Sequence, residues 1–330
     1  MCPNLKNTSD SSMNNEPFSQ SNPDSQLLLN QIVIDYMRDK KNARRWRWVK
    51  RTIFLIFLIA LAILVWSSAS TTDTASSKPH VGVIDINGDI FDSKAGNADD
   101  FAKGIDAAYK NTDLKALIIR INSPGGSPVQ AEYMYNTINY YKKKNKEVKV
   151  YAVCMDICAS AAYYVAVAAD QIYASPASMV GSIGVLYNGF GFTEIMQKVG
   201  VTRRLETSGI NKGFLDPFSP ESPEQKQKLQ TMLHIIHNQF IARVKEGRGA
   251  HLKVNDDTFS GLFWTGEQAL SMGLIDGLGS SGQVARDVIK INNVVDYTSK
   301  QSLFDRMSKN LGTAMADELP LSLGFKAGFK

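Results

Sequence analysis

The sequence is poor in the residues that cross-link small secreted domains or hold metal ions. Its only cysteines are Cys2, Cys154 and Cys158. An odd number of cysteines does not make a disulfide framework, and their spacing lacks the paired pattern of a zinc site. Cys154 and Cys158 lie in an apolar stretch, where a small buried thiol is common. We therefore expect inert thiols and no metal cofactor.

The net positive charge is also confined to one segment. The formal net charge is +5, but residues 38–51 (RDKKNARRWRWVKR) alone carry eight Lys or Arg and one Asp. The rest of the chain is nearly neutral, so a general nucleic-acid-binding surface is not indicated. The one sharp Gly-rich turn, NSPGG, lacks the Lys and the Ser or Thr of a Walker loop, so no nucleotide cofactor is expected.

One long apolar run follows the basic segment. Residues 53–66 read IFLIFLIALAILVW, and no charge occurs between Thr52 and Asp73, which is roughly enough helix to cross a bilayer. Basic residues on its N-terminal side predict a cytoplasmic N-terminus and a C-terminal part outside. A cleaved signal peptide is the competing interpretation, because the apolar core is short and small residues follow it. An uncleaved anchor is favoured, because a signal peptide would not begin with about fifty residues before its apolar core.

These features divide the chain into five predicted parts. Residues 1–51 form a cytoplasmic segment, largely disordered and then basic, and residues 52–72 form one transmembrane helix. Residues 73–79 are a linker, residues 80–290 the main domain, and residues 291–330 a C-terminal extension with a helix near residues 302–311.

Short β-rich runs alternate with helical stretches in the main domain. This alternation predicts an α/β fold of βα units with a mainly parallel sheet. Ser222 and Pro223 predict the start of a long helix, and Thr265 caps another that Gly273 closes. The expected strands span 81–88, 116–122, 148–154 and 171–174, and the expected helices span 99–109, 129–143, 159–169 and 223–246.

Two segments carry residue types that suit acyl-transfer chemistry. Asn122 to Gly126 (NSPGG) follows a buried strand and precedes a helix, and its glycines allow the backbone to present N–H groups to an oxyanion. Such a turn is equally common without a function. Ser160 in DICASAAYY heads a helix of small residues, where it is either a helix cap or a nucleophile beside the Ala161 N–H.

A serine nucleophile needs a base, and histidine is scarce. None of the four histidines lies between Ser160 and residue 233. The remaining candidates are lysines, which act as bases only when burial lowers their pKa. Most lysines here lie in charged runs, whereas Lys212 is flanked by glycines and by Phe214 and Leu215. From position alone, a loop lysine without a function is still the better interpretation.

From about residue 81 to 289 the chain resembles the signal peptide peptidase A family, S49 (protease IV), in its half-length bacterial form. The matching stretches, in the family's order, are INSPGGS, CASAAYY, SPASMVGSIGV, ETSGINKGF and FWTGEQALSMGLIDGLG. The resemblance implies a Clp-protease/crotonase-like fold of repeated ββα units. It also implies a membrane-attached homo-oligomeric ring with active sites between protomers, on the outer side of the bacterial inner membrane.

The resemblance implies a site as well. Ser160 would be the nucleophile and Lys212 the general base, with Ser182 orienting the lysine. Gly125 and the Ala161 N–H would form the oxyanion hole. The family usually has two glycines after the nucleophile, and this chain has Ala161 and Ala162. The expected substrates are apolar peptides, remnant signal peptides in particular, and no metal or other cofactor is expected.

Two other functions fit parts of the pattern. A crotonase-like acyl-CoA enzyme would share the Gly-based oxyanion hole, but the carboxylate it needs is not evident. A catalytically inactive membrane scaffold of the same fold would keep the motifs without the chemistry. A Ser160 that reacts as a nucleophile would distinguish a peptidase from both of these alternatives.

Overall fold

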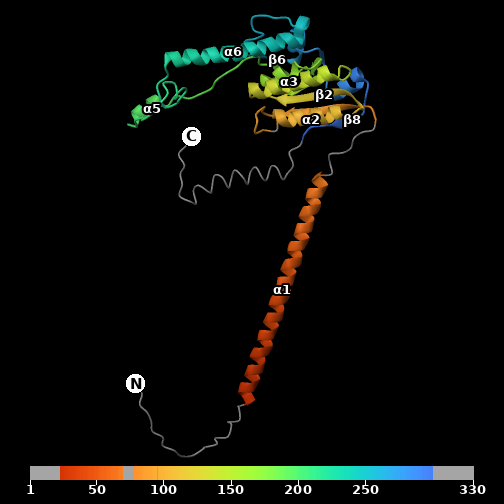
Figure 1. The fold of residues 1–330 in the computed structure, drawn as a ribbon, viewed down its shortest axis with the longest axis vertical. Helices are drawn as coiled ribbons and strands as arrows, with labels where there is room; N and C mark the ends of the chain where they lie inside the picture. The colour runs from red at the N-terminus through yellow and green to blue at the C-terminus, as the bar shows by residue number, and fades with distance from the viewer. Residues whose placement is uncertain (1–22, 70–77, 95, 300–330) are drawn as a thin grey trace, which may run out of the picture. The chain divides into compact units, whose positions relative to one another are not determined.

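The computed structural model describes residues 23–69, 78–94 and 96–299. The chain separates into two compact units, with the division between Thr74 and Ala75. The predicted disordered tail, most of the linker and the helix expected near residues 302–311 lie outside the described residues. The first unit contains helix α1 (Pro23–Ala69), and the second contains a mixed sheet with its helices (Figure 1).

Helix α1 includes two segments that are predicted separately from the sequence. The basic segment (residues 38–51) and the apolar run (residues 53–66) belong to one uninterrupted helix of 47 residues. The predicted transmembrane helix at residues 52–72 is not supported, since within the described ranges no helix is long and apolar enough to cross a membrane.

The second unit is built on an eight-stranded sheet. Its main path runs β6-β5-β3-β2-β1-β8, with β4 paired to β3 and β7 paired to β4. Every strand pair is parallel apart from β5 and β6, which are antiparallel. The predicted α/β class with a mainly parallel sheet is therefore confirmed. The strands are β1 (His80–Asn87), β2 (Leu114–Ser123), β3 (Lys149–Ala159), β4 (Gln171–Ala174), β5 (Met179–Gly181), β6 (Phe263–Thr265), β7 (Gly277–Leu278) and β8 (Val294–Asp296).

The helices lie between these strands in sequence. Asn97 and Ser127 cap α2 and α3 through their side chains, and Thr265 forms a capping box at α7, as its position predicts. Pro223 opens α6, which follows the predicted boundaries closely. The helices are α2 (Ala98–Lys110), α3 (Pro128–Lys144), α4 (Ala161–Ala166), α5 (Thr193–Lys198), α6 (Pro223–Arg248), η2 (Gly249–His251), α7 (Gly266–Ser271), α8 (Ser281–Gln283) and η3 (Val284–Ile289).

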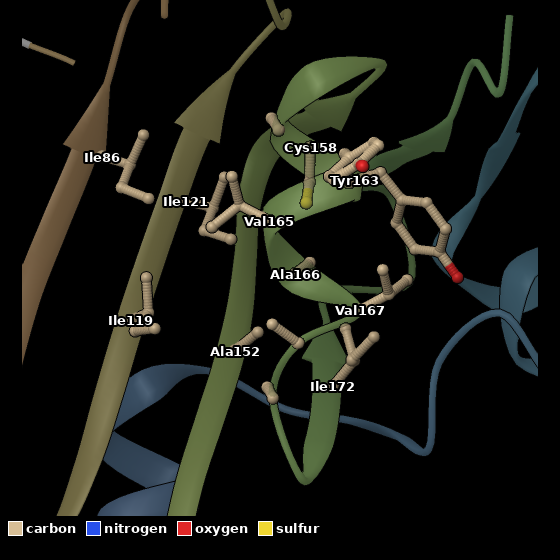
Figure 2. Packing of buried hydrophobic residues seen from close by; sticks show 14 of the residues in the cluster. Ile86, Ile119, Ile121, Ala152, Cys158, Tyr163, Val165, Ala166, Val167 and Ile172 are labelled. Carbon is tan, nitrogen blue, oxygen red and sulfur yellow. The ribbon is translucent and has the colours of Figure 1, made fainter. Parts of the chain in front are cut away.

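Successive residues of the central strands face opposite sides of the sheet, so the sheet has two apolar faces. On one face Ile84, Ile119 and Ile121 pack with residues of α2, α3, α4 and α6. On the other, Val83 and Ile118 pack against η3. Figure 2 shows Val165 of α4 directed toward Ile121 of β2, so α4 is anchored in the main core by its buried side chains.

The structure corrects the predicted strand and helix around residue 159. Strand β3 was expected to end at Cys154 but continues to Ala159, and the helix begins only at Ala161. The reason is tertiary pairing: Ile157 to Ala159 pair in parallel with Met179 to Gly181 of β5. The small residues that suggested a helix from residue 159 onward therefore form both the end of a strand and the start of a helix.

A buried ion pair fastens the end of α6 to the sheet. The Arg248 guanidinium donates two hydrogen bonds of 2.8 Å to the Asp276 carboxylate and a third, also 2.8 Å, to the Gly273 carbonyl. Arg248 is only 3% exposed. Burial alone would raise the pKa of Asp276, but hydrogen bonds from Arg248 and from the Ile172 N–H outweigh it, and the pKa is lowered.

The depressed Asp276 pKa predicts acid-sensitive stability. The carboxylate stabilises the fold above its unfolded-state pKa of about 4, and this contribution is lost as pH falls through the lower folded-state pKa. Replacing Asp276 with asparagine should lower the free energy of unfolding by about 3 kcal/mol at pH 7, because a buried guanidinium loses its counter-charge. The loss should be smaller at pH 3, and urea unfolding of the full chain at the two pH values measures it.

The exposed pair Arg286–Asp287 provides the control. Both side chains are more than half exposed, so Asp287→Asn should cost less than about 1 kcal/mol. Equal losses in the two variants would contradict the stabilising role given to the buried pair.

Candidate functional site

Ser160 occupies the one residue between the end of β3 and the start of α4. Its backbone has φ 53° and ψ −126°, a combination that non-glycine residues rarely adopt, and its side chain makes no capping hydrogen bond. Such a conformation costs about 1–3 kcal/mol and persists only where the surroundings enforce it. Ser160 is therefore not an ordinary helix cap. A strained serine at a sharp strand-to-helix turn is typical of an exposed nucleophile.

Two backbone hydrogen bonds hold Ser160 in this conformation. Its N–H donates to the Gly181 carbonyl at 2.8 Å, and its carbonyl accepts from the Tyr164 N–H at 3.0 Å. The Ala161 N–H, at the first position of α4, has no partner within the helix. It is thus placed beside Ser160 and is suited to bind an oxyanion.

The NSPGG turn lies directly against Ser160. Gly125 has φ +108°, and a Cβ at this position would lie 2.8 Å from the Ser160 Cβ and 2.9 Å from the Ala161 nitrogen. Only glycine fits between them. The predicted proximity of Gly125, Ser160 and Ala161 is therefore present in the structure.

The Gly125 N–H differs from the expectation in one respect. It donates to the side-chain oxygen of Ser123, which is fully buried, at 3.1 Å. In this structure the Gly125 N–H is thus engaged within its own turn, while the Ala161 N–H follows Ser160 directly in the chain. Sequence reasoning did not single out Ser123, although a serine two residues before a turn glycine is typical of such a local bond.

Ser182 follows β5 as Ser160 follows β3. Because β3 and β5 are parallel neighbours with Ala159 paired to Gly181, both serines come directly after paired residues at the same edge of the sheet. Ser182 also has a positive φ, 50°, and its N–H donates to the Leu262 carbonyl at 2.8 Å. The structure therefore places the predicted nucleophile and its predicted partner on adjacent strand ends.

Lys212 is not brought to this site within the described chain. It lies in an exposed turn, where its N–H donates to the Gly209 carbonyl at 2.9 Å. The turn belongs to residues 185–222, here called the arm, which also contains α5. Figure 1 shows α5 at the far end of α6 from β2 and α3. Among the described residues, no hydrogen bond or ion pair connects the Lys212 side chain to Ser160 or Ser182.

Other candidate bases and ligands do not converge on Ser160. The His237 ring donates from Nε2 to the Ile183 carbonyl at 3.0 Å, and His80 pairs with the Tyr297 hydroxyl at 2.8 Å. Within residues 23–69, 78–94 and 96–299, no group of three or more His, Cys, Asp or Glu could hold a metal ion. Cys154 and Cys158 are buried in the core, and burial raises the pKa of the Cys158 thiol.

Two models of known protein families match the part of the chain that contains this site. The model for peptidase family S49 matches residues 142–294, which include Ser160, Ser182 and Lys212. This chain belongs to peptidase family S49. The Clp protease model matches residues 82–181, which include Gly125 and Ser160, so the S49 chain has a Clp-protease-like domain.

Individual relatives agree with the S49 assignment. A protein of Synechocystis sp. named as a protease is 28% identical over 257 residues, 72% of this chain and 89% of that protein. A protein of Enterococcus faecium named as a signal peptide peptidase SppA is 24% identical over 236 residues, 69% of this chain and 68% of that protein.

A relative with a higher sequence identity than these two is not named as a protease. A Na⁺/H⁺ antiporter NhaA of Brucella melitensis is 47% identical over 175 residues, which are 53% of this chain and 24% of that protein. The S49 chain thus spans about a quarter of the length of this antiporter.

Proposed function

We propose that the chain is a serine peptidase in which the Ser160 hydroxyl attacks the carbonyl carbon of a peptide bond. The observation that carries the proposal is the strained Ser160 backbone between Gly125 and the Ala161 N–H, in a chain of family S49. The serine proton passes to the base as the Oγ–C bond forms, and the carbonyl oxygen becomes an oxyanion beside the Ala161 N–H. Collapse expels the amine with a proton, and water then hydrolyses the acyl-serine.

The proposed base is Lys212, oriented by Ser182, with the two residues contributed by different protomers. Two observations support this arrangement. Lys212 is exposed in the single chain, although a lysine serves as a base only when desolvated. The arm also exposes many large apolar side chains, as an interface with a second copy would. They are Leu186, Tyr187, Phe190, Phe192, Ile195, Val199, Val201, Leu205, Ile210 and Phe218.

The proposed substrates are apolar peptides, remnant signal peptides among them. Gly181 accepts a hydrogen bond from Ser160 and pairs with Phe263 of β6. Beside it, Met179 of β5 and Phe263 are 37% and 54% exposed. Large apolar side chains so close to the nucleophile favour apolar residues in the peptide.

The test is hydrolysis by the full chain in detergent of a panel of apolar and polar peptides of equal length, with products identified by mass. Cleavage should be faster for apolar peptides and should occur without added metal or nucleotide. An acyl-CoA thioester, the substrate class of a crotonase-like enzyme, serves as the parallel assay. Turnover of the thioester with every peptide left intact would reject the peptidase.

The proposed location is the outer side of the bacterial inner membrane, with the attachment at residues 52–72. Its support is the apolar sequence after the basic segment and the exposed side chains from Ile53 to Ile63 of α1. A reporter fused after Lys330 should be active only outside the cytoplasm. Reporter activity confined to the cytoplasm would reject the orientation, and release of the protein by alkaline washing would reject the attachment.

Gly125 gives a steric prediction for the proposed site. Gly125→Ala should lower kcat/KM for peptide cleavage by about 10²-fold, because the added Cβ would displace Ser160 or the Ala161 N–H. Gly88→Ala is the matched control, since Gly88 also has a positive φ, +73°, but nothing lies within 4 Å of the added atom. Equal activity of the two variants would contradict the packing argument.

A further inference from the structure

Tyr164, one turn after Ser160, lies in a small network of polar and aromatic side chains from three helices. Its hydroxyl donates a short hydrogen bond to Oε2 of Glu132 on α3. The other carboxylate oxygen of Glu132 accepts a 2.7 Å hydrogen bond from the guanidinium of Arg243 on α6. One carboxylate therefore connects the helix that follows Ser160 to both α3 and α6.

The ring of Tyr164 is fixed from its sides as well. It meets Tyr135 edge to face at 5.7 Å between ring centroids and Phe240 at 5.1 Å. The Arg243 guanidinium lies over the Tyr135 ring, 4.9 Å from its centroid. Burial alone would raise the pKa of Glu132, but hydrogen bonds from Arg243, Tyr164 and Asn136 lower it, so the acceptor is ionised at neutral pH.

The backbone of Tyr164 is the direct link to the site. Its N–H donates to the Ser160 carbonyl at 3.0 Å, one of the two backbone bonds that hold the strained serine. Helix α4 has only six residues, and its capping serine makes no side-chain hydrogen bond, so the helix has little stability of its own. A strained residue beside such a short helix persists only if neighbouring elements fix the helix.

We propose that Tyr164 and Glu132 are positioning residues, which hold α4 so that Ser160 and the Ala161 N–H keep their reactive geometry. This inference rests on the proposed peptidase function. Arg243 fixes Glu132 in turn, so the network also ties the nucleophile to α6, the helix that directly follows the arm carrying Lys212. In the proposed reaction, residues 132, 164 and 243 touch no reacting atom.

The test compares two tyrosine hydroxyls in the full chain. Tyr164→Phe removes the hydroxyl that donates to Glu132 and leaves the ring in place. Tyr141→Phe, the matched control, removes a hydroxyl that donates to Asp106 at 2.9 Å, between α3 and α2. Both variants should show similar decreases in thermal stability. Only Tyr164→Phe should lower kcat and the rate of fluorophosphonate labelling of Ser160, by about tenfold, with KM changed by less than about twofold.

A second pair tests the acceptor. Glu132→Ala should match Tyr164→Phe in kcat, whereas Glu132→Gln keeps an oxygen for the Tyr164 hydroxyl and should recover part of the loss. If Glu132 only stabilised the fold, Glu132→Gln and Glu132→Ala variants of equal thermal stability would have the same kcat. If Tyr164→Phe and Tyr141→Phe retain the same kcat and labelling rate, the positioning role is overturned.

Hydrogen exchange separates this inference from the proposed function. The backbone N–H at position 164 should exchange about tenfold faster in Tyr164→Phe than in the parent and should be unchanged in Tyr141→Phe. If a fluorophosphonate does not label Ser160 in the parent protein, the peptidase proposal fails. The exchange rate of the N–H at position 164 then still shows whether the network holds α4. Unchanged exchange at position 164 would reject the network's role in either case.

Discussion

Ser160→Ala is expected to lower kcat for peptide cleavage by about 10⁴-fold to 10⁶-fold, because the variant lacks the hydroxyl that forms the acyl intermediate. The variant keeps its backbone contacts to Gly181 and Tyr164, since both involve main-chain atoms. Binding of the peptide, measured as the KM or as a dissociation constant, should change little. The measurement is steady-state hydrolysis of an apolar peptide.

Ser182→Ala is the matched control for this experiment. Ser182 lies at the adjacent strand end and has a φ of 50°, against 53° for Ser160, so each variant places alanine at a positive φ. An orienting role for Ser182 predicts a loss of only about 10-fold to 10²-fold. If Ser182→Ala were inactive and Ser160→Ala active, the two serines would have the opposite roles.

Lys212→Ala is expected to lower kcat by about 10²-fold to 10⁴-fold, as the loss of a general base does. Lys198→Ala, which removes another exposed lysine of the arm, should retain the parent rate. Unchanged hydrolysis by Lys212→Ala would remove the base from the proposed mechanism.

Co-expression of Ser160→Ala with Lys212→Ala tests whether two chains build each site. If Ser160 and Lys212 come from neighbouring protomers, random mixing should leave about one quarter of the sites intact and restore a similar share of activity. If both residues come from one chain, the mixed oligomer should be as inactive as its parts. The exposed Lys212 turn and the apolar arm favour the first result.

How far the sequence predicted the fold depended on the length of each element. Strands β1 to β4 are apolar runs bounded by turn residues, and all four were predicted. Strands β5 to β8 have two or three residues each, too few for a periodic pattern, and were not. The end of β3 was missed for the same reason, because its last residues are held by pairing with β5 and not by local propensity.

The site was predicted in part by chemistry and in part by resemblance. Small residues around Ser160 and the two glycines after Pro124 indicated an oxyanion site, and the structure places Gly125 against Ser160. The positive φ of Ser160 and Ser182 was not predictable, because tertiary contacts impose it against the preference of serine. Lys212 as a base came from family resemblance alone and stays a prediction.

The residues that fix Tyr164 carried no local signal. Glu132 is 32 positions away from Tyr164, and Arg243 is 111 positions away from Glu132. Only folding brings these groups together. A charged residue in a helix such as α3 or α6 is usually solvated, so its sequence context gave no reason to select it.

The proposed Ser160–Lys212 pair is tested by the site at which a fluorophosphonate labels the full-length protein covalently. We expect one adduct, on Ser160 in the peptide that joins β3 to α4, with slower labelling in Lys212→Ala and none in Ser160→Ala. An adduct on another serine, or labelling of the parent and of Lys212→Ala at the same rate, would contradict the proposed Ser160–Lys212 pair.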